Sequence, residues 1–159
     1  MIALYGRPNS QHTQKVLWAC AEMQLDFRFV PVGRVSRGEV DPEYLRLNPN
    51  GLVPTLVEDG FVLWESNTIL RYLAGRHGGG RFIPTDLQAR ASGERWMDWQ
   101  ATTLNDAFRP VFRPLVEGPP AARQPDLLRP AVERLNDTIA ILDRYLAGKA
   151  YVTGESFSV

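Results

Sequence analysis

Hydrophobic residues are spaced in two different ways along this chain, and the spacing changes near its middle. In the first half, short apolar runs at residues 2–5, 27–30, 55–57 and 61–63 are bounded by glycine, proline and charged residues, as strands commonly are. Beyond residue 86 the apolar positions recur every three or four residues, which is the period of an α-helix. The pattern therefore predicts an α/β domain followed by an all-α domain.

The first half carries signals for a strand, a helix and a second strand in succession. Ser10 is a suitable N-cap, and apolar residues follow it at helical spacing as far as Leu25. A short helix is expected around residues 43–47, and the Asp59–Gly60 pair between two apolar runs predicts a hairpin. A further helix begins near Glu65. The expected order is βαβ, α, ββα, which opens with a parallel βαβ unit.

Two long helical stretches are predicted in the second half. The first runs from residue 87 to about residue 104 and continues to residue 116, with a break near Pro110 and Pro114 because proline interrupts a helix interior. The second covers residues 127–146.

A glycine-rich stretch separates the two patterns. Residues 78–80 are consecutive glycines, which end the preceding helix and favour a flexible connection. We therefore expect a first domain over residues 1–76, a linker over 77–86 and a helical domain over 87–159.

Composition narrows the possible classes of function. The chain has 159 residues, 44% of them hydrophobic, and its basic and acidic residues balance, so no charged surface favours nucleic acid or an anionic membrane. We recognise neither a bilayer-spanning stretch nor a signal peptide. Cys20 is the single cysteine, which excludes a disulfide framework or a cysteine-rich metal site within one chain. We expect a cytoplasmic protein that holds no metal.

Two short segments could carry chemistry. If the Val53–Pro54 bond is cis, the backbone of Val53 points into a cleft and can pair with an extended peptide; a trans proline would only start the strand. Glu65 and Ser66 lie at a predicted helix start, where free N–H groups attract a carboxylate. The alternative for that pair is simple helix capping.

Several segments together resemble the glutathione S-transferase family in its bacterial, serine-type form. They are Asn-Pro-Asn-Gly-Leu-Val-Pro-Thr-Leu at residues 48–56, Trp-Glu-Ser-Asn at 64–67, Trp-Met-Asp-Trp-Gln at 96–100 and Gly-Glu-Ser-Phe-Ser-Val at 154–159. The resemblance covers the whole chain. It implies a thioredoxin-like, glutathione-binding first domain and an enzyme that joins the glutathione thiolate to a small hydrophobic electrophile.

The resemblance also implies roles for individual residues. Val53 and Pro54 would hold the cysteinyl backbone of glutathione, and Glu65 and Ser66 its γ-glutamyl group. Asn50 is expected among the residues that bind glutathione. Glutathione is then a co-substrate, and no metal or further cofactor is required.

The reactive sulfur of glutathione is expected at the first turn of the first helix. The thioredoxin fold carries a cysteine pair there, which this chain lacks, whereas many transferases use a hydroxyl. Ser10 is the matching hydroxyl; a hydrogen bond from it would favour the thiolate, and lowering the thiol pKa by two units corresponds to about 2.7 kcal/mol. Asn9 and His12 are alternative donors, and Ser10 could serve only as a cap.

The electrophile is expected in an apolar pocket between the domains. The residues that we expect to line it are Trp96, Phe108, Arg109 and Phe112, with packing in the interdomain core as the alternative for Trp96.

By resemblance, the helical domain is incomplete, because family members continue past Val159. Phe157 and Ser158 are similar to the staple and N-cap of a capping box whose helix would follow. The resemblance further implies a homodimer. Two alternatives stay open: a glutathione-fold binding module without turnover, and a specialised glutathione-dependent isomerase or dehalogenase.

Overall fold

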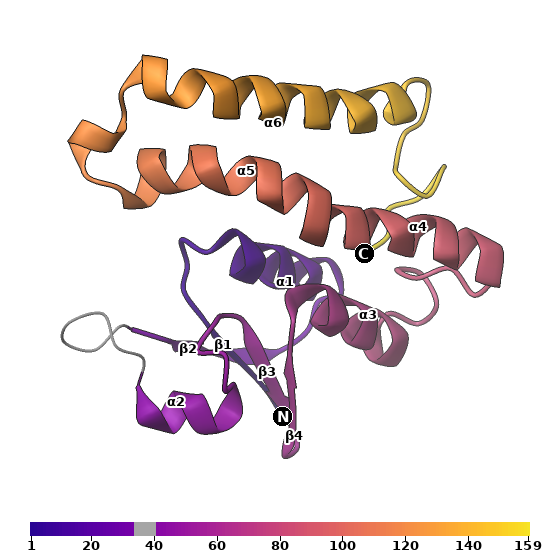
Figure 1. Cartoon of the computed structure of the whole chain (residues 1–159). Coiled ribbons are helices and arrows are strands. Elements are labelled where there is room, and N and C mark those ends of the chain that lie inside the picture. Colours follow the sequence, from indigo (N-terminus) through magenta and orange to yellow (C-terminus); the bar gives the residue numbers. More distant parts are fainter. Residues whose placement is uncertain (34–40) are drawn as a thin grey trace. The chain divides into compact units, whose positions relative to one another are not determined.

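The computed structural model describes residues 1–33 and 41–159 and divides into two compact units (Figure 1). Unit 1 comprises Met1–Ile83 with Val159, and unit 2 comprises Pro84–Ser158.

Unit 1 is built on a four-stranded mixed sheet. Its strand order is β2-β1-β3-β4, in which β1 and β2 are parallel and the other neighbouring pairs are antiparallel. This confirms the predicted βαβ opening and the following hairpin. The strands are β1 (Ile2–Gly6), β2 (Phe27–Pro31), β3 (Thr55–Glu58) and β4 (Phe61–Trp64).

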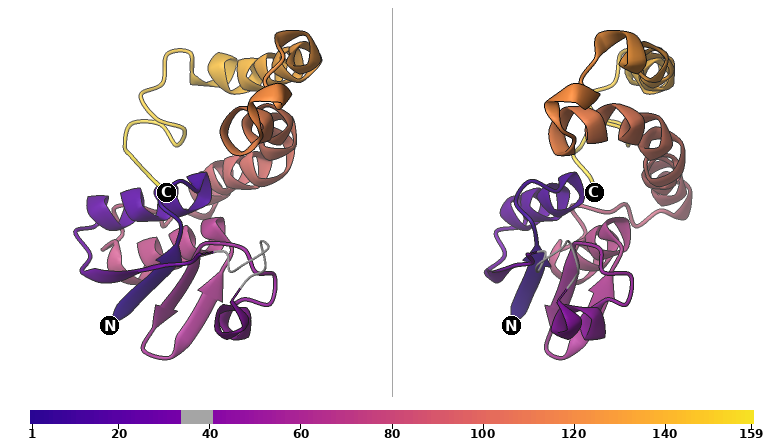
Figure 2. Two further views of the ribbon diagram at one scale, coloured as in Figure 1. Left: turned by 90° about the vertical axis from the view of Figure 1, so that its left-hand side faces the viewer. Right: turned by 60° about the vertical axis from the view of Figure 1, so that its left-hand side comes forward.

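Three helices flank this sheet: α1 (Gln11–Glu22), α2 (Pro42–Leu47) and α3 (Ser66–His77). Helices α1 and α3 lie together on one face and α2 lies on the other (Figure 2). The apolar side chains of Leu4 and Leu56 on the sheet and Ile69 and Leu73 on α3 are fully buried. Each such burial stabilises the fold by about 1.5–3 kcal/mol. The architecture is thus the predicted thioredoxin-like one.

The hairpin between β3 and β4 turns at the Asp-Gly pair that the sequence indicated. Asp59 has φ of 49° and Gly60 has φ of 87°. A two-residue turn with both central residues at positive φ matches the twist of the flanking strands, and aspartate followed by glycine tolerates it best. The N-terminal ammonium of Met1 forms an ion pair with Asp59 and so ties the chain start to this turn.

A buried carboxylate connects the hairpin to the end of α3. Glu58 is 6% exposed and accepts hydrogen bonds from Tyr72 Oη at 2.6 Å and from Arg76 Nε at 3.3 Å, with His77 Nε2 at 2.9 Å. Burial alone would raise the pKa of Glu58, but these neighbours outweigh it and hold that pKa below its ordinary value.

Unit 2 consists of long helices, with α6 lying alongside α5 (Figure 1). The first predicted stretch is one continuous helical path whose hydrogen bonding changes along it. Of the two prolines near which a break is predicted, Pro110 is the wrong one, because α5 runs through it; after α5 the hydrogen-bonding pattern changes at the π-helical turn that contains Pro114. The elements are α4 (Leu87–Trp99), η2 (Gln100–Leu104), α5 (Asn105–Phe112), η3 (Arg113–Glu117), η4 (Pro120–Ala122) and α6 (Pro125–Leu146).

The core of unit 2 is small. Its aromatic centre joins α4 to α6, with the rings of Trp96 and Tyr145 4.5 Å apart. Apolar residues of α6 such as Leu127, Ile139 and Ile141 are exposed. Among the described residues, no helix is both long and apolar enough to cross a membrane.

Candidate functional site

The strand register brings the predicted glutathione-binding segments together at one end of the sheet, where neighbouring strands begin or end. Tyr5 near the end of β1 lies opposite Thr55 at the start of β3, and Thr55 lies opposite Trp64 at the end of β4. The segments that follow β1, precede β3 and follow β4 therefore leave neighbouring strands at the same end of the sheet. These segments carry Ser10, the Val53–Pro54 pair and the Glu65–Ser66 pair.

Ser10 is the N-cap of α1, as the sequence predicted. Its Oγ accepts a hydrogen bond from the backbone N–H of Thr13 at 3.4 Å. A serine hydroxyl is one donor and two acceptors, so this bond leaves the O–H of Ser10 free to donate elsewhere. Capping and donation to a thiolate are therefore compatible in one residue.

The loop before Ser10 approaches α1 closely because of a glycine. A Cβ at Gly6 would lie 2.4 Å from Thr13 Cγ2, closer than any side chain allows.

Of the alternative donors, Asn9 is exposed, and the ring of His12 is half-buried with its Nε2 3.5 Å from Gln11 Nε2.

Cys20, in the last turn of the same helix, is fully buried. Burial raises the pKa of Cys20 to about 11.

The Val53–Pro54 peptide bond is cis, so the trans alternative is wrong. Val53 is buried, while Leu52 beside it is 62% exposed, and Gly51 supplies a positive φ of 62° for the turn before them. The hydrogen-bonded ladder of β3 begins only at Thr55. The backbone of Val53 thus lies outside the ladder, where an extended peptide could pair with it.

A buried polar cluster, which was not predicted from the sequence, supports the loop before β3. Tyr44 Oη donates to the carbonyl oxygen of Leu52 at 2.5 Å and lies 2.8 Å from Thr55 Oγ1. Asn48 Nδ2 donates to the carbonyl oxygen of Leu52 at 2.8 Å and to Thr55 Oγ1 at 3.2 Å. Burial raises the pKa of Tyr44. The sequence signal for this cluster was a tyrosine and an asparagine spaced one helical turn apart, directly before the loop.

Asn50 extends the cluster toward solvent. Its backbone N–H and its Nδ2 both donate to Asn48 Oδ1, at 3.1 and 3.0 Å. The side chain of Asn50 is exposed but held by these bonds.

Glu65 has an unusual backbone conformation directly before α3. Its φ is 71° and its ψ is 110°, a region that non-glycine residues rarely occupy and that tends to occur at functional sites. Although Glu65 is the N-cap, its side chain makes no capping hydrogen bond. Ser66, the first residue of α3, is 7% exposed. The helix start is therefore not closed by the Glu65 carboxylate, contrary to the capping alternative for that residue.

Lys15 on α1 reaches this helix start, a contact that was not predicted from the sequence. Its Nζ donates to Asn67 Oδ1 at 2.5 Å. Burial lowers the pKa of Lys15 to about 8; Glu65 opposes this shift, and Arg71 adds to it. Both signs of charge are therefore present around the first turns of α3.

The residues predicted to line an electrophile pocket all belong to unit 2. Trp96 packs against Trp99 at 5.2 Å as well as against the α6 tyrosine. On α5, the rings of Phe108 and Phe112 stack 5.1 Å apart, and Arg109 is exposed. Phe108 and Phe112 thus share one face of that helix.

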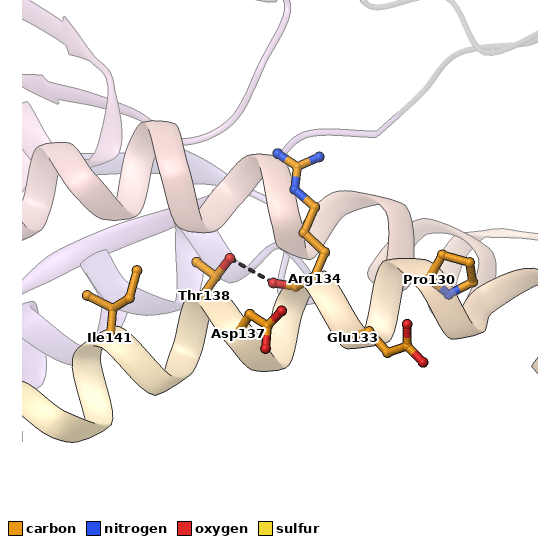
Figure 3. A pocket seen from close by; sticks show the side chains of 6 residues that line it. All are labelled: Pro130, Glu133, Arg134, Asp137, Thr138 and Ile141. Carbon is orange, nitrogen blue, oxygen red and sulfur yellow. Dashed lines mark hydrogen bonds between the residues drawn. The ribbon is translucent and has the colours of Figure 1, made fainter.

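The described residues also enclose hollows. One, of about 400 Å³, lies between the end of β2 and α2 and includes Tyr5 and Tyr44 in its lining. Another, of about 410 Å³, follows α6, where Thr138 bonds back to its own helix at Arg134 (Figure 3). Among the described residues, no group of histidine, cysteine, aspartate and glutamate side chains could hold a metal ion.

Comparisons with known proteins agree with this geometry. The family model for the glutathione S-transferase N-terminal domain matches residues 4–81. Glutathione S-transferase GstB of Escherichia coli (strain K12) is 38% identical over 161 residues, which cover 100% of this chain and 77% of that protein. Glutathione S-transferase 3 of Zea mays is 30% identical and is covered to 72% of its length.

Solved structures give the same result. The theta class glutathione S-transferase of Xanthomonas axonopodis pv. citri with glutathione bound superposes with a TM-score of 0.90 at 38% identity, covering 99% of this chain and 75% of that one. Glutathione transferase F7 of Populus trichocarpa superposes with a TM-score of 0.87 at 30% identity, covering 99% and 76%. The chain belongs to the glutathione S-transferase family.

Proposed function

We propose that this protein is a glutathione transferase that joins the glutathione thiolate to a small hydrophobic electrophile. The observation that carries the proposal is the convergence of three segments at one end of the sheet: the Ser10 turn, the Val53–Pro54 loop and the Glu65–Ser66 helix start. Residues 1–76 would form the glutathione-binding domain and residues 87–159 the helical domain. The family membership supports this assignment.

Each segment meets a different part of glutathione. The backbone of Val53 next to Pro54 would pair with the cysteinyl residue as a short strand does. The N–H groups at the start of α3, with Ser66, would hold the γ-glutamyl carboxylate, and the Glu65 carboxylate its ammonium. Asn50 lies on the loop that borders this peptide.

Catalysis then needs a thiolate and a nearby electrophile. The O–H of Ser10 at the start of α1 would donate to the sulfur and favour its ionised form, since charge-assisted hydrogen bonds stabilise the charged partner. Asn9 and His12 are the alternative donors. The electrophile would lie against Trp96, Phe108, Arg109 and Phe112, and holding both reactants lowers the barrier without a covalent enzyme intermediate.

We further propose a cytoplasmic homodimer with a role in detoxification. Strand β4 is a sheet edge whose Phe61, Val62 and Trp64 are between 36% and 48% exposed. An exposed apolar edge of this kind favours association with a second surface.

The proposal is tested by calorimetric titration with glutathione, followed by thiolate absorbance against pH on the same sample. Saturable binding with a bound-thiol pKa below that of free glutathione is the expected result. A folded protein that binds no glutathione would contradict the proposal. Binding with a lowered thiol pKa but no conjugation of any electrophile would favour a binding module, and turnover of one narrow substrate would favour a specialised isomerase or dehalogenase.

A further inference from the structure

A positively charged side chain lies where the proposed γ-glutamyl position begins, and the proposed mechanism does not use it. Lys15 is on the second turn of α1, which packs against α3. Its ammonium donates to Asn67 Oδ1 at 2.5 Å, and Asn67 is the second residue of α3, directly after Ser66. A half-buried lysine therefore contacts the helix start from a neighbouring element.

The placement is electrostatically costly, which makes a purely structural role a poor explanation. A cation beside a helix N-terminus opposes the helix dipole, and burial removes it from water. Two charged groups act on Lys15: Glu65, the N-cap of α3, attracts it, and Arg71 on α3 repels it. Because burial and Arg71 together outweigh Glu65, the pKa of Lys15 is lowered to about 8.

We propose that Lys15 is a positioning residue for the γ-glutamyl end of glutathione, which it serves by holding Asn67 and by adding positive charge where the ligand's carboxylate lies. The inference rests on the proposed function. The γ-glutamyl end carries one ammonium and one carboxylate. Glu65 suits the first, and the helix start with Lys15 suits the second. Lys15 then sets the preference for glutathione over thiols that lack this group.

The test compares two ligands that differ only at that end: S-hexylglutathione and S-hexylcysteinylglycine. The S-hexyl group removes the thiol and its ionisation from the comparison. Calorimetry at pH 6.5, where Lys15 is charged, gives the ratio of the affinity for S-hexylglutathione to the affinity for S-hexylcysteinylglycine. We expect Lys15→Met to reduce this ratio about tenfold, and Lys15→Arg to restore most of it. Lys149→Met is the matched control, because Lys149 is exposed on unit 2, where its Nζ donates to the backbone oxygen of Tyr145 and lies over the ring of the same residue.

Two further readouts separate positioning from structural support. Thermal unfolding should show that Lys15→Met does not lower the midpoint, because the variant removes a costly buried charge. At pH 9.5 the wild-type lysine loses its charge whereas arginine keeps it, so wild type should approach Lys15→Met and depart from Lys15→Arg. An unchanged ratio in Lys15→Met, or equal weakening of both ligands, would overturn the inference alone. A wild-type protein that shows no preference for S-hexylglutathione would overturn the proposed function as well.

Discussion

At the scale of single residues, Ser10 illustrates how one hydroxyl can meet two demands. Its oxygen accepts from Thr13 at the start of α1, and its hydrogen remains available. The sequence indicated both possibilities but gave no means to choose, because capping and donation use the same residue type at the same position.

The role of Ser10 can be measured directly. Ser10→Ala should raise the pKa of the bound glutathione thiol toward that of the free thiol and lower kcat/KM, because the charge-assisted bond to the sulfur is lost. We expect a loss of about ten- to a hundredfold, equivalent to about 1.4–2.7 kcal/mol. Thiolate absorbance against pH is the measurement. Ser158→Ala serves as the matched serine variant, and a thiolate titration unchanged in Ser10→Ala would sink the assignment.

Glu58 shows a second residue-scale effect, in which a buried charge stabilises the hairpin against α3. Glu58→Gln should lower the free energy of unfolding at pH 7 by about 1–2 kcal/mol, since a neutral amide replaces the carboxylate that Tyr72 and Arg76 contact and interacts with them more weakly. The folded-state pKa of Glu58 is depressed, so its contribution is present above the unfolded pKa and is lost as pH falls through the folded one.

Denaturant unfolding at several pH values checks this prediction. The difference between wild type and Glu58→Gln should shrink as the solution is acidified, because the wild-type carboxylate then takes up a proton. Glu43→Gln is the control: its partner Arg46 lies with it at the exposed surface, where such pairs contribute little. A difference that stays constant down to acid pH would show that the charge of Glu58 is not what matters.

At the scale of elements, the Tyr44–Asn48–Thr55 cluster couples α2 and β3 to the loop between them. All three side chains are at most 4% exposed and share acceptors beneath Leu52. A buried polar group without a hydrogen-bond partner destabilises the fold. Each of these three side chains is therefore needed to hold the loop in one conformation.

Asn48→Ala should therefore destabilise the protein by about 1–3 kcal/mol and weaken glutathione binding, because the Leu52 carbonyl loses a donor and the loop loosens. Amide hydrogen exchange is the measurement, and the amides of residues 50–53 should exchange faster while those of α3 stay protected. Asn136→Ala removes an exposed asparagine of α6 and should change neither the stability of the protein nor its binding of glutathione. Unaltered exchange in the Asn48→Ala loop would mean that this network does not hold it.

The order of elements in unit 1 could be predicted because each has a local signal. The Ser10 cap, the Asp59–Gly60 turn and the short apolar runs all depend on neighbours within a few residues. The contact between Lys15 and Asn67 had no such signal, because 52 residues separate its members. Pro110 lies within α5 because the packing of α5 on α6 overrides the local preference of proline against a helix interior.

At the scale of the whole molecule, the edge strand β4 is the feature that bears on assembly. Phe61 lies against Tyr72 at 5.3 Å and still remains 48% exposed. Natural sheets usually protect such edges with charge or a covering element. A second subunit is the cover that we propose.

Phe61→Asp should shift the protein toward the monomer, because it places a charge in the apolar patch of β4. Sedimentation velocity over a range of concentrations measures the shift. Leu45→Glu on α2 adds a charge at another exposed apolar residue and should leave the association constant unchanged. Equal association of wild type and Phe61→Asp would place the interface elsewhere.

The burial of Cys20 has a consequence for an enzyme that handles electrophiles. Thiolates rather than thiols react with alkylating agents and disulfides. With a pKa of about 11, roughly one Cys20 in ten thousand is ionised at neutral pH, and its side chain is fully buried. The sulfur of Cys20 therefore escapes alkylation by such compounds and mixed disulfides with glutathione. The electrophiles that the enzyme uses as substrates therefore do not inactivate it through Cys20.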